Sequence, residues 1–247
     1  MLSVALRLFI FCLFHPCIQG PQVPVNTEVL AQMIQYFDEK LQPGGNNQYS
    51  VLIRVPYQHC TDRFSLDSVF NTNEIKTAFN YFKTNRGRRL YEVTKDSVSL
   101  TATKPSLDPT SSSEEDDHAE YILIYSRDDA NTPSPLQKIL DMINDDQCVV
   151  LYTYNSPCIT KCINDEDDSI LHGLSNWKNT QTTGIKAFVF QKIWPKDSTG
   201  LAEDQKEQFT KINDLVPLYR CVKNNNQMQC YKCGTAGSLM LLPDCVS

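Results

Sequence analysis

The sequence lacks the excess of basic residues that proteins gripping a nucleic-acid backbone usually show. Its 23 lysines and arginines are outnumbered by 29 aspartates and glutamates, which leaves a formal net charge of −6, and no stretch of the chain forms a basic stripe. Contacts from lysine and arginine to phosphate supply most of the affinity for nucleic acid. The acidic balance therefore argues against a nucleic-acid partner.

The sequence also has no long apolar run beyond its first twenty residues. Residues 1–20 read MLSVALRLFIFCLFHPCIQG. This apolar run carries one positive charge, at Arg7, and ends at the small residue Gly20. This run is too short and wrongly flanked for a membrane span, and it is typical of a cleaved secretory signal peptide, with an uncleaved N-terminal anchor as the alternative. We therefore expect a secreted, extracellular protein without a membrane span.

Sequons for N-glycosylation are absent as well, whereas cysteines are plentiful. Ten cysteines minus the two in the predicted signal peptide leave eight in the mature chain. In an oxidising compartment an even cysteine count normally indicates disulfides. The eight are Cys60, Cys148, Cys158, Cys162, Cys221, Cys230, Cys233 and Cys245.

The apolar pattern of the chain predicts strands that alternate with helices. The runs CVVLYTY and KAFVFQKI are almost continuously apolar, which suits strands buried on both faces by helices. A strand, a helix and a second strand joined by short connections form a right-handed crossover unit, so we expect a layered α/β sandwich over residues 21–215. Residues 216–247 hold four cysteines and are predicted to form a disulfide-rich tail. Helices are predicted over 27–41, 73–83 and 202–215 and from Ser134 and Pro157, a strand over 50–55, and a hairpin from RLYEV and SVSLTAT.

The stretch NSPCITKC, residues 155–162, places two cysteines one helical turn apart directly after a buried strand. Ser156 and Pro157 are typical of the cap and the first position of a helix. Cys158 and Cys162 would then share one face at the amino end, where the helix dipole favours thiolate over thiol. Two thiolates held on one helix face do not readily form a disulfide with each other, and a divalent metal is their natural partner.

The tripeptide HAE, residues 118–120, offers further candidates at the start of another predicted helix. In the first turn both His118 and Glu120 can reach a metal that lies beyond the helix end. His118 could ligate it, and Glu120 would stay free to take a proton from a bound water. Catalytic zinc takes three protein ligands and keeps one position open for water, so His118 would complete a set with the two cysteines.

H-x-E followed by S-P-C-x₃-C, with a buried strand before the second motif, resembles the signature of the zinc-dependent cytidine deaminase-like superfamily, which includes AID/APOBEC-type enzymes. The resemblance implies zinc bound by His118, Cys158 and Cys162, with Glu120 as a proton shuttle that is not a ligand. It also implies a three-layer α/β/α sandwich around a mixed, roughly five-stranded sheet. The chain departs from the signature in having three residues, not two, between the cysteines, and a long segment between the motifs.

This resemblance implies a secreted zinc hydrolase that deaminates a cytosine- or adenine-type base through attack of zinc hydroxide, with Glu120 moving the protons. Acidic runs at 114–117 and 165–168 flank the two motifs. If they line the mouth of the site rather than simply cap helices, they would repel a phosphate backbone, which favours a nucleoside or related small substrate over nucleic acid. Tyr154 and Asn155 precede the ligand helix and are candidates for contact with the base. The alternative is a secreted, disulfide-stabilised interaction protein without enzymatic activity, on a deaminase-like or unrelated scaffold.

Setting the two proposed ligands aside leaves six cysteines as disulfide candidates, and six allow 15 connectivities in principle. Cys230 and Cys233 form a C-x-x-C, for which a second zinc site is an alternative to disulfides. Cys148 begins a buried strand and could instead be a core thiol. The candidates are Cys60, Cys148, Cys221, Cys230, Cys233 and Cys245.

Overall fold

A computed structural model of the chain describes most of the residues between Pro24 and Val246. The predicted signal peptide, most of the helix predicted over 73–83 and the acidic run 114–117 lie outside the described residues. Within the described part, no helix has the length and the apolar character needed to cross a membrane. The described residues are 24–43, 48–67, 70, 73–74, 77, 80, 90–105, 118–125, 132–144, 146–166, 169–198, 200, 202–238 and 241–246.

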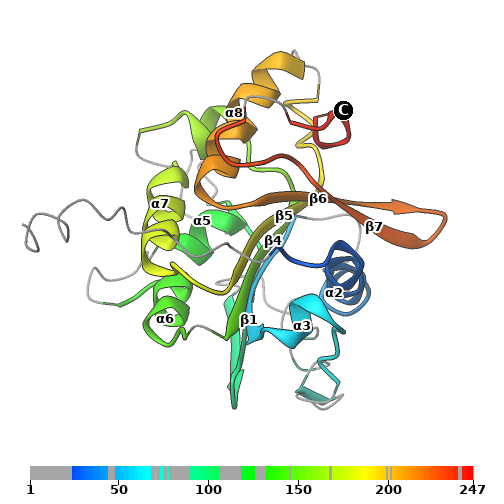
Figure 1. Cartoon of the computed structure of the whole chain (residues 1–247), viewed down its shortest axis with the longest axis vertical. Coiled ribbons are helices and arrows are strands. Elements are labelled where there is room, and N and C mark those ends of the chain that lie inside the picture. The colour runs from blue at the N-terminus through cyan, green and yellow to red at the C-terminus, as the bar shows by residue number, and fades with distance from the viewer. Residues whose placement is uncertain are drawn as a thin grey trace, which may run out of the picture.

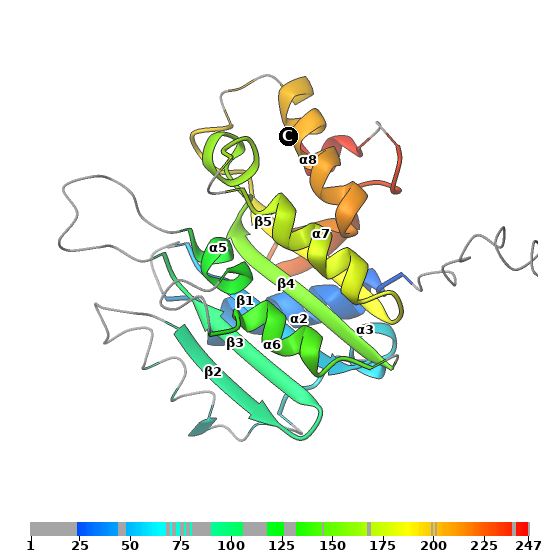
Figure 2. The same cartoon turned by 90° about the vertical axis from the view of Figure 1, so that its left-hand side faces the viewer.

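The described strands form one mixed sheet with the order β2-β3-β1-β4-β5-β6-β7 (Figures 1 and 2). β4, β5 and β6 are parallel, and the other neighbours are antiparallel. The sheet has seven strands rather than the roughly five expected, because the cysteine-rich tail adds β6 and β7 to the edge of β5. Without β6 that edge would leave backbone groups of a buried strand unpaired. The strands are β1 (Ser50–Pro56), β2 (Leu90–Lys95), β3 (Val98–Thr103), β4 (Gln147–Asn155), β5 (Ile185–Lys192), β6 (Leu218–Asn224) and β7 (Gln227–Lys232).

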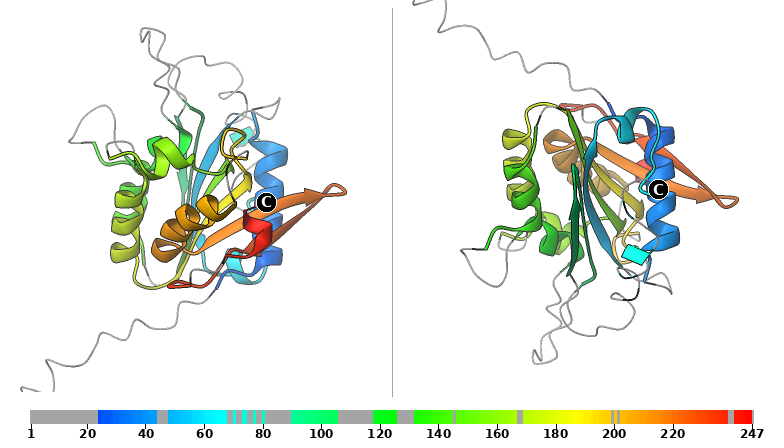
Figure 3. Two further views of the ribbon diagram at one scale, coloured as in Figure 1. Left: turned by 90° about the horizontal axis from the view of Figure 1, so that it is seen from above. Right: turned by 90° about the horizontal axis from the view of Figure 1, so that it is seen from below.

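Helices cover both faces of this sheet, as the two views in Figure 3 show. α2 and α3 lie on one face, and α5, α6 and α7 lie on the other. A cluster of buried apolar side chains fills each interface, and β4 contributes Tyr152 to the cluster at α2 and Leu151 to the cluster at α7. Successive side chains of a strand point to opposite faces, which is why this strand is buried along its whole length. The helices are α2 (Thr27–Lys40), α3 (Gln58–Thr61), α5 (Ala119–Ile124), α6 (Pro135–Asp141), α7 (Leu171–Thr180) and α8 (Ala202–Leu215), with a short 3₁₀-helix η2 (Pro243–Cys245) near the end.

Local signals begin two of the helices where the sequence predicts them. The side chain of Asn26 accepts hydrogen bonds from the backbone amides of Glu28 and Val29 at the start of α2. Ser134 accepts one from the amide of Gln137 at the start of α6, and Pro135 occupies the first position of that helix. Both caps satisfy backbone donors that have no partner inside the helix.

The crossover between the parallel strands β4 and β5 holds two helices, not the single helix expected from the sequence. A short π-helix, η1 (Ile159–Ile163), comes first, and α7 follows it. The carboxyl ends of parallel strands lie at the same edge of a sheet, so the segment after β4 and the segment after β5 meet there. This edge positions the candidate site.

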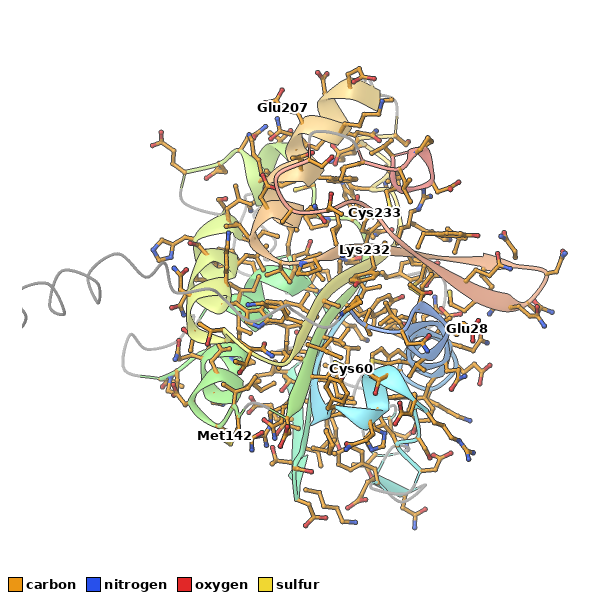
Figure 4. All side chains as sticks on the ribbon, viewed as in Figure 1. Glu28, Cys60, Met142, Glu207, Lys232 and Cys233 are labelled. Atoms are coloured by element: carbon orange, nitrogen blue, oxygen red, sulfur yellow. A yellow bond between two sulfur atoms is a disulfide. The ribbon has the colours of Figure 1, made fainter. Side chains whose placement is uncertain are left out.

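Six cysteines form the disulfides Cys60–Cys148, Cys221–Cys230 and Cys233–Cys245. They are the six that remained once the proposed metal ligands were set aside; Figure 4 labels Cys60 and Cys233. Cys148 is therefore not a free core thiol. The two cysteines of the C-x-x-C belong to different disulfides, which leaves no thiolate there for a second zinc.

Replacing both Cys60 and Cys148 by alanine should destabilise the protein more than replacing both Cys233 and Cys245. The first disulfide joins residues 88 positions apart and the second joins residues 12 apart. The entropy of loop closure then contributes about 4.6 and about 2.8 kcal/mol to the free energy of unfolding, respectively. Denaturant unfolding of the parent and the two double variants measures the difference, and an equal loss in both variants would contradict the dependence on loop length.

Candidate metal centre

The two motifs, far apart in the sequence, meet at the carboxyl edge of β4. His118 Nδ1 lies 2.8 Å from Cys162 Sγ and 3.5 Å from Cys158 Sγ, and the two sulfurs are 3.0 Å apart. Cys158 and Cys162 are both free thiols. One nitrogen and two sulfurs thus face a common point, with all three atoms within 4.8 Å of one another.

His118 stands immediately before α5 rather than within it. Its backbone is extended, with φ −67° and ψ 144°, and the helix begins at Ala119. Figure 2 shows α5 beside β4, and α5 also approaches α7 very closely. A Cβ atom on Gly173 of α7 would lie 2.1 Å from Ile124 Cγ2 of α5. A larger residue at 173 would therefore force α5 and α7 apart, and α5 follows His118 and bears Glu120.

The ligand helix begins two residues later than the sequence predicts. Cys158 has an extended backbone, with φ −68° and ψ 139°, and is the N-cap of η1, which starts at Ile159 rather than at Pro157. The Cys158 sulfur accepts a hydrogen bond from the Cys162 amide at 3.2 Å. A backbone N–H directed at the sulfur favours the thiolate form that a metal requires.

Ser156 does not cap this helix, because its hydroxyl has another partner. Ser156 Oγ accepts a hydrogen bond from the backbone N–H of Trp194 at 2.9 Å. Asp197 Oδ2 instead accepts the Ile159 amide at 3.0 Å, which satisfies the amino end of η1. Trp194 and Asp197 both follow β5, and the Trp194 ring centroid lies 6.3 Å from that of His118. The segment after β5 therefore fastens the cysteine motif in place.

The hydrogen bond between the two sulfurs, which are 3.0 Å apart, shifts the pKa values of the two thiols in opposite directions. The hydrogen bond from Cys162 lowers the pKa of Cys158 to about 4, and His118 adds to this effect while burial opposes it. The same hydrogen bond, together with burial, raises the pKa of Cys162 far above its ordinary value. The hydrogen bond with Cys158 also raises the pKa of His118. A divalent cation would stabilise both thiolates at once, and its binding would release any proton that remains on the two sulfurs.

This donor set fits zinc. Zinc binds histidine nitrogen at about 2.1 Å and cysteine sulfur at about 2.3 Å, so a tetrahedral centre holds its donors roughly 3.6–3.8 Å apart. The three separations here are 2.8, 3.0 and 3.5 Å, so shifts of less than about 1 Å bring the atoms to zinc distances. Thiolate and imidazole suit zinc, whereas magnesium and calcium prefer oxygen. Three protein ligands also leave the fourth position open for water, as in catalytic zinc sites.

Residues 27–242 match the model of the family described as Secreted Novel AID/APOBEC-like Deaminase 1 (SNAD1). The chain belongs to this family. The match confirms the resemblance predicted from the two motifs, and it includes all seven strands of the sheet. No curated protein and no solved structure matches the chain. The word "secreted" in the family description agrees with the three disulfides of the fold.

Glu120, which the family resemblance implies to be the proton shuttle, is buried beside the candidate metal ligands. Its side chain is 1% exposed, and Oε1 lies 3.7 Å from Cys162 Sγ. Burial raises the pKa of the Glu120 carboxyl, and the charge of His118 partly offsets that rise. A carboxyl whose pKa is shifted toward neutrality can both accept and release a proton during catalysis.

Two polar residues that the sequence did not single out contact the Glu120 carboxylate. Gln48 Nε2 lies 3.2 Å from Glu120 Oε2, and Thr153 Oγ1 lies 3.5 Å from the same oxygen. Strand alternation could have placed Thr153 on the face of the site, since it lies in β4 before the cysteine motif. No local signal marks Gln48. It reaches the site because β1 pairs with β4 so that Ser50 lies opposite Thr153.

The structure separates the two residues expected to contact a base. Tyr154 belongs to the apolar cluster on the α2 face, stacked on Tyr49 with ring centroids 5.9 Å apart. It does not line the metal centre, whose cysteines belong to the cluster on the other face. Asn155 alternates with Tyr154, so it lies on the same face as Thr153 and is 7% exposed. Of the two predicted residues, Asn155 remains a candidate for contact with substrate.

Proposed function

We propose that this chain is a zinc-dependent deaminase that hydrolyses the exocyclic amine of a cytosine- or adenine-type base. The burial of Glu120 beside His118, Cys158 and Cys162, in a member of a deaminase family, is the observation that supports this most strongly. His118, Cys158 and Cys162 would hold zinc, which would lower the pKa of a bound water to about 7 and so provide a nucleophile at neutral pH. Hydrolytic deamination needs this nucleophile together with one group that moves protons.

The proton transfers fall to the Glu120 carboxylate. It takes a proton from the attacking water and delivers it to the ring nitrogen beside the reacting carbon. A second transfer through the same carboxylate protonates the departing amine, which leaves as ammonia while the ring carbon gains a carbonyl oxygen. The site excludes bulk water from the carboxylate, since the Glu120 side chain is only 1% exposed. The transferred proton therefore passes between Glu120 and the substrate rather than to solvent.

A nucleoside or a related small molecule is the substrate class that we propose. The net charge of the chain is −6, and the exposed residues Asp165 and Glu166 lie two and three residues after the end of η1. Carboxylates near the site would repel a phosphate backbone. Asn155 offers a polar side chain for the edge of a base, and Trp194 places an aromatic ring near His118.

A panel of nucleosides and free bases tests the proposed function on the purified, zinc-loaded protein. We expect ammonia release from at least one cytosine or adenine compound, one zinc per chain, and two titratable thiols after denaturation with a chelator. Single-stranded oligonucleotides, tested for binding across a salt series, provide the comparison, and we expect weak binding. Zinc-loaded protein that deaminates no compound on the panel would contradict the proposal. Protein with neither zinc nor free thiols would support the non-enzymatic alternative.

A further inference from the structure

We infer that Gln48 is a positioning residue of the active site, whose side-chain amide holds the Glu120 carboxylate in place and ties it to the end of β4. This inference rests on the proposed function, in which Glu120 moves protons. Gln48 lies two residues before β1, outside both sequence motifs. Its role follows from side-chain contacts with residues that are 72 to 107 positions away in the sequence.

Three hydrogen bonds place the Gln48 amide between α5 and β4. Its nitrogen Nε2 donates to Glu120 Oε2 at 3.2 Å and to Thr153 Oγ1 at 2.7 Å. Its oxygen Oε1 accepts the backbone N–H of Asn155 at 2.8 Å. Both hydrogens of the amide nitrogen and one lone pair of the oxygen are thereby used.

These partners allow only one orientation of the amide. If the amide were flipped, Oε1 would face the Glu120 carboxylate, so that two acceptors would meet. Nε2 would face the Asn155 N–H, so that two donors would meet. The flip would remove the hydrogen bonds to Glu120 and to the Asn155 amide, whereas the Thr153 hydroxyl can donate or accept in either orientation. The backbone of Asn155 thus fixes the oxygen end of Gln48, and this fixes the donor end against Glu120.

The contact matters for catalysis because few side chains hold the carboxylate, which otherwise accepts a hydrogen bond from the backbone N–H of Glu120 itself. Thr153 Oγ1 lies 3.5 Å from Glu120 Oε2, and Cys162 Sγ lies 3.7 Å from Oε1, so Gln48 makes the shortest of these three contacts. The helix that bears Glu120 is only six residues long. A general base must stay within hydrogen-bond reach of the proton it takes, and a misplacement of about 1 Å can cost about 100-fold in rate.

The same amide also aligns the carboxylate with the segment that bears the cysteine ligands. Asn155 ends β4, and Cys158 follows three residues later. Gln48 therefore joins α5, the end of β4 and the segment before β1 at one point. A displacement of the cysteine segment would move Gln48, and Glu120 with it. The coupling would keep the Glu120 carboxylate at a constant distance from the candidate metal ligands.

Two variants of the zinc-loaded enzyme test this inference by kinetics. Gln48→Met keeps the length of the side chain and removes all three hydrogen bonds, whereas Gln48→Glu keeps an oxygen for the Asn155 amide and places a second carboxyl group beside Glu120. We expect kcat to fall about 10- to 100-fold in both variants, with KM changed by less than about twofold and one zinc per chain retained. Gln32→Met, the same substitution at an exposed glutamine of α2, should match the parent. Parent-like kcat in Gln48→Met would show that the donor to Glu120 is unimportant and would overturn the inference.

Crystal structures of the parent and of Gln48→Met provide a measurement that does not depend on activity. We expect the Glu120 carboxylate to leave its place near Thr153 Oγ1 in the variant and to keep it in the parent. A carboxylate that stays in place without Gln48 would overturn the inference. A zinc-loaded parent that deaminates nothing would refute the proposed function instead, and the crystal structures would still decide whether Gln48 positions Glu120.

Discussion

Replacing Glu120 by glutamine should lower kcat by about 10³-fold or more, within the 10²- to 10⁴-fold range that general acid–base catalysis contributes. The amide has nearly the same shape as the carboxylate and still offers an oxygen to Gln48 Nε2, which lies 3.2 Å from Glu120 Oε2 in the parent. It cannot, however, take a proton from water or give one to the departing amine. Initial rates on the best nucleoside of the panel, together with the zinc content of each protein, measure the effect.

The Glu120→Gln variant should remain folded and should still bind zinc, because Glu120 is not among the three ligands. Its free energy of unfolding should equal or exceed that of the parent, since the substitution removes a buried ionisable group. Glu166→Gln removes an exposed carboxylate four residues after Cys162 and should leave kcat unchanged. If Glu120→Gln kept more than a tenth of the parent kcat with its zinc in place, Glu120 would not be the proton shuttle.

Replacing Cys162 by serine should weaken zinc binding by more than about 100-fold, the upper end of the effect seen when only a partner of a ligand is removed. The substitution exchanges a thiolate for a neutral hydroxyl in a centre that has only three protein ligands. Because the variant would lose its zinc, its deaminase activity should fall below detection. Zinc binding stabilises the folded state, by about 4 kcal/mol at a zinc concentration 1,000 times Kd, so a chelator should lower the Tm of the parent and leave that of the variant unchanged.

Zinc titration against a competing chelator and thermal unfolding with and without the chelator are the two measurements. His118→Ala provides a second ligand variant that keeps both thiols. It is therefore unaffected by any wrong disulfide that the single remaining thiol of Cys158 forms in Cys162→Ser. Thr160→Ala, at an exposed position within η1, should behave like the parent. Equal zinc affinity in the parent and in both ligand variants would contradict the proposed metal centre.

The features that could be read from the sequence are those that depend on a few neighbouring residues. Asn26 and Ser134 cap helices through their own side chains, and the apolar run of β4 is buried on both faces, as a continuously apolar strand should be. The two motifs indicated which side chains have the chemistry for zinc. The number of cysteines, less the two proposed ligands, left the six that form disulfides.

Contacts between distant residues decided the rest. The start of η1 depends on Trp194 and Asp197, each 38 residues from its partner, and so the local Ser-Pro signal was misleading. The side chain of Tyr154 faces away from the site because the position of α5 determines which face of β4 holds the metal centre. β6 pairs with the edge of β5 and so satisfies backbone groups that would otherwise be unpaired. The spacing of the cysteines does not reveal this strand pairing.

Gln48 shows most clearly the difference between what neighbouring residues reveal and what contacts between distant residues decide. By itself the sequence determined the residues that would bind and activate a metal, since their chemistry and spacing are local properties of two short motifs. Only the tertiary structure decided what holds them together, because the Gln48 amide meets Glu120 and Asn155 across 72 and 107 residues of chain. Such a contact depends on strand register and on the packing of α5 beside β4, and neither leaves a pattern in neighbouring residues.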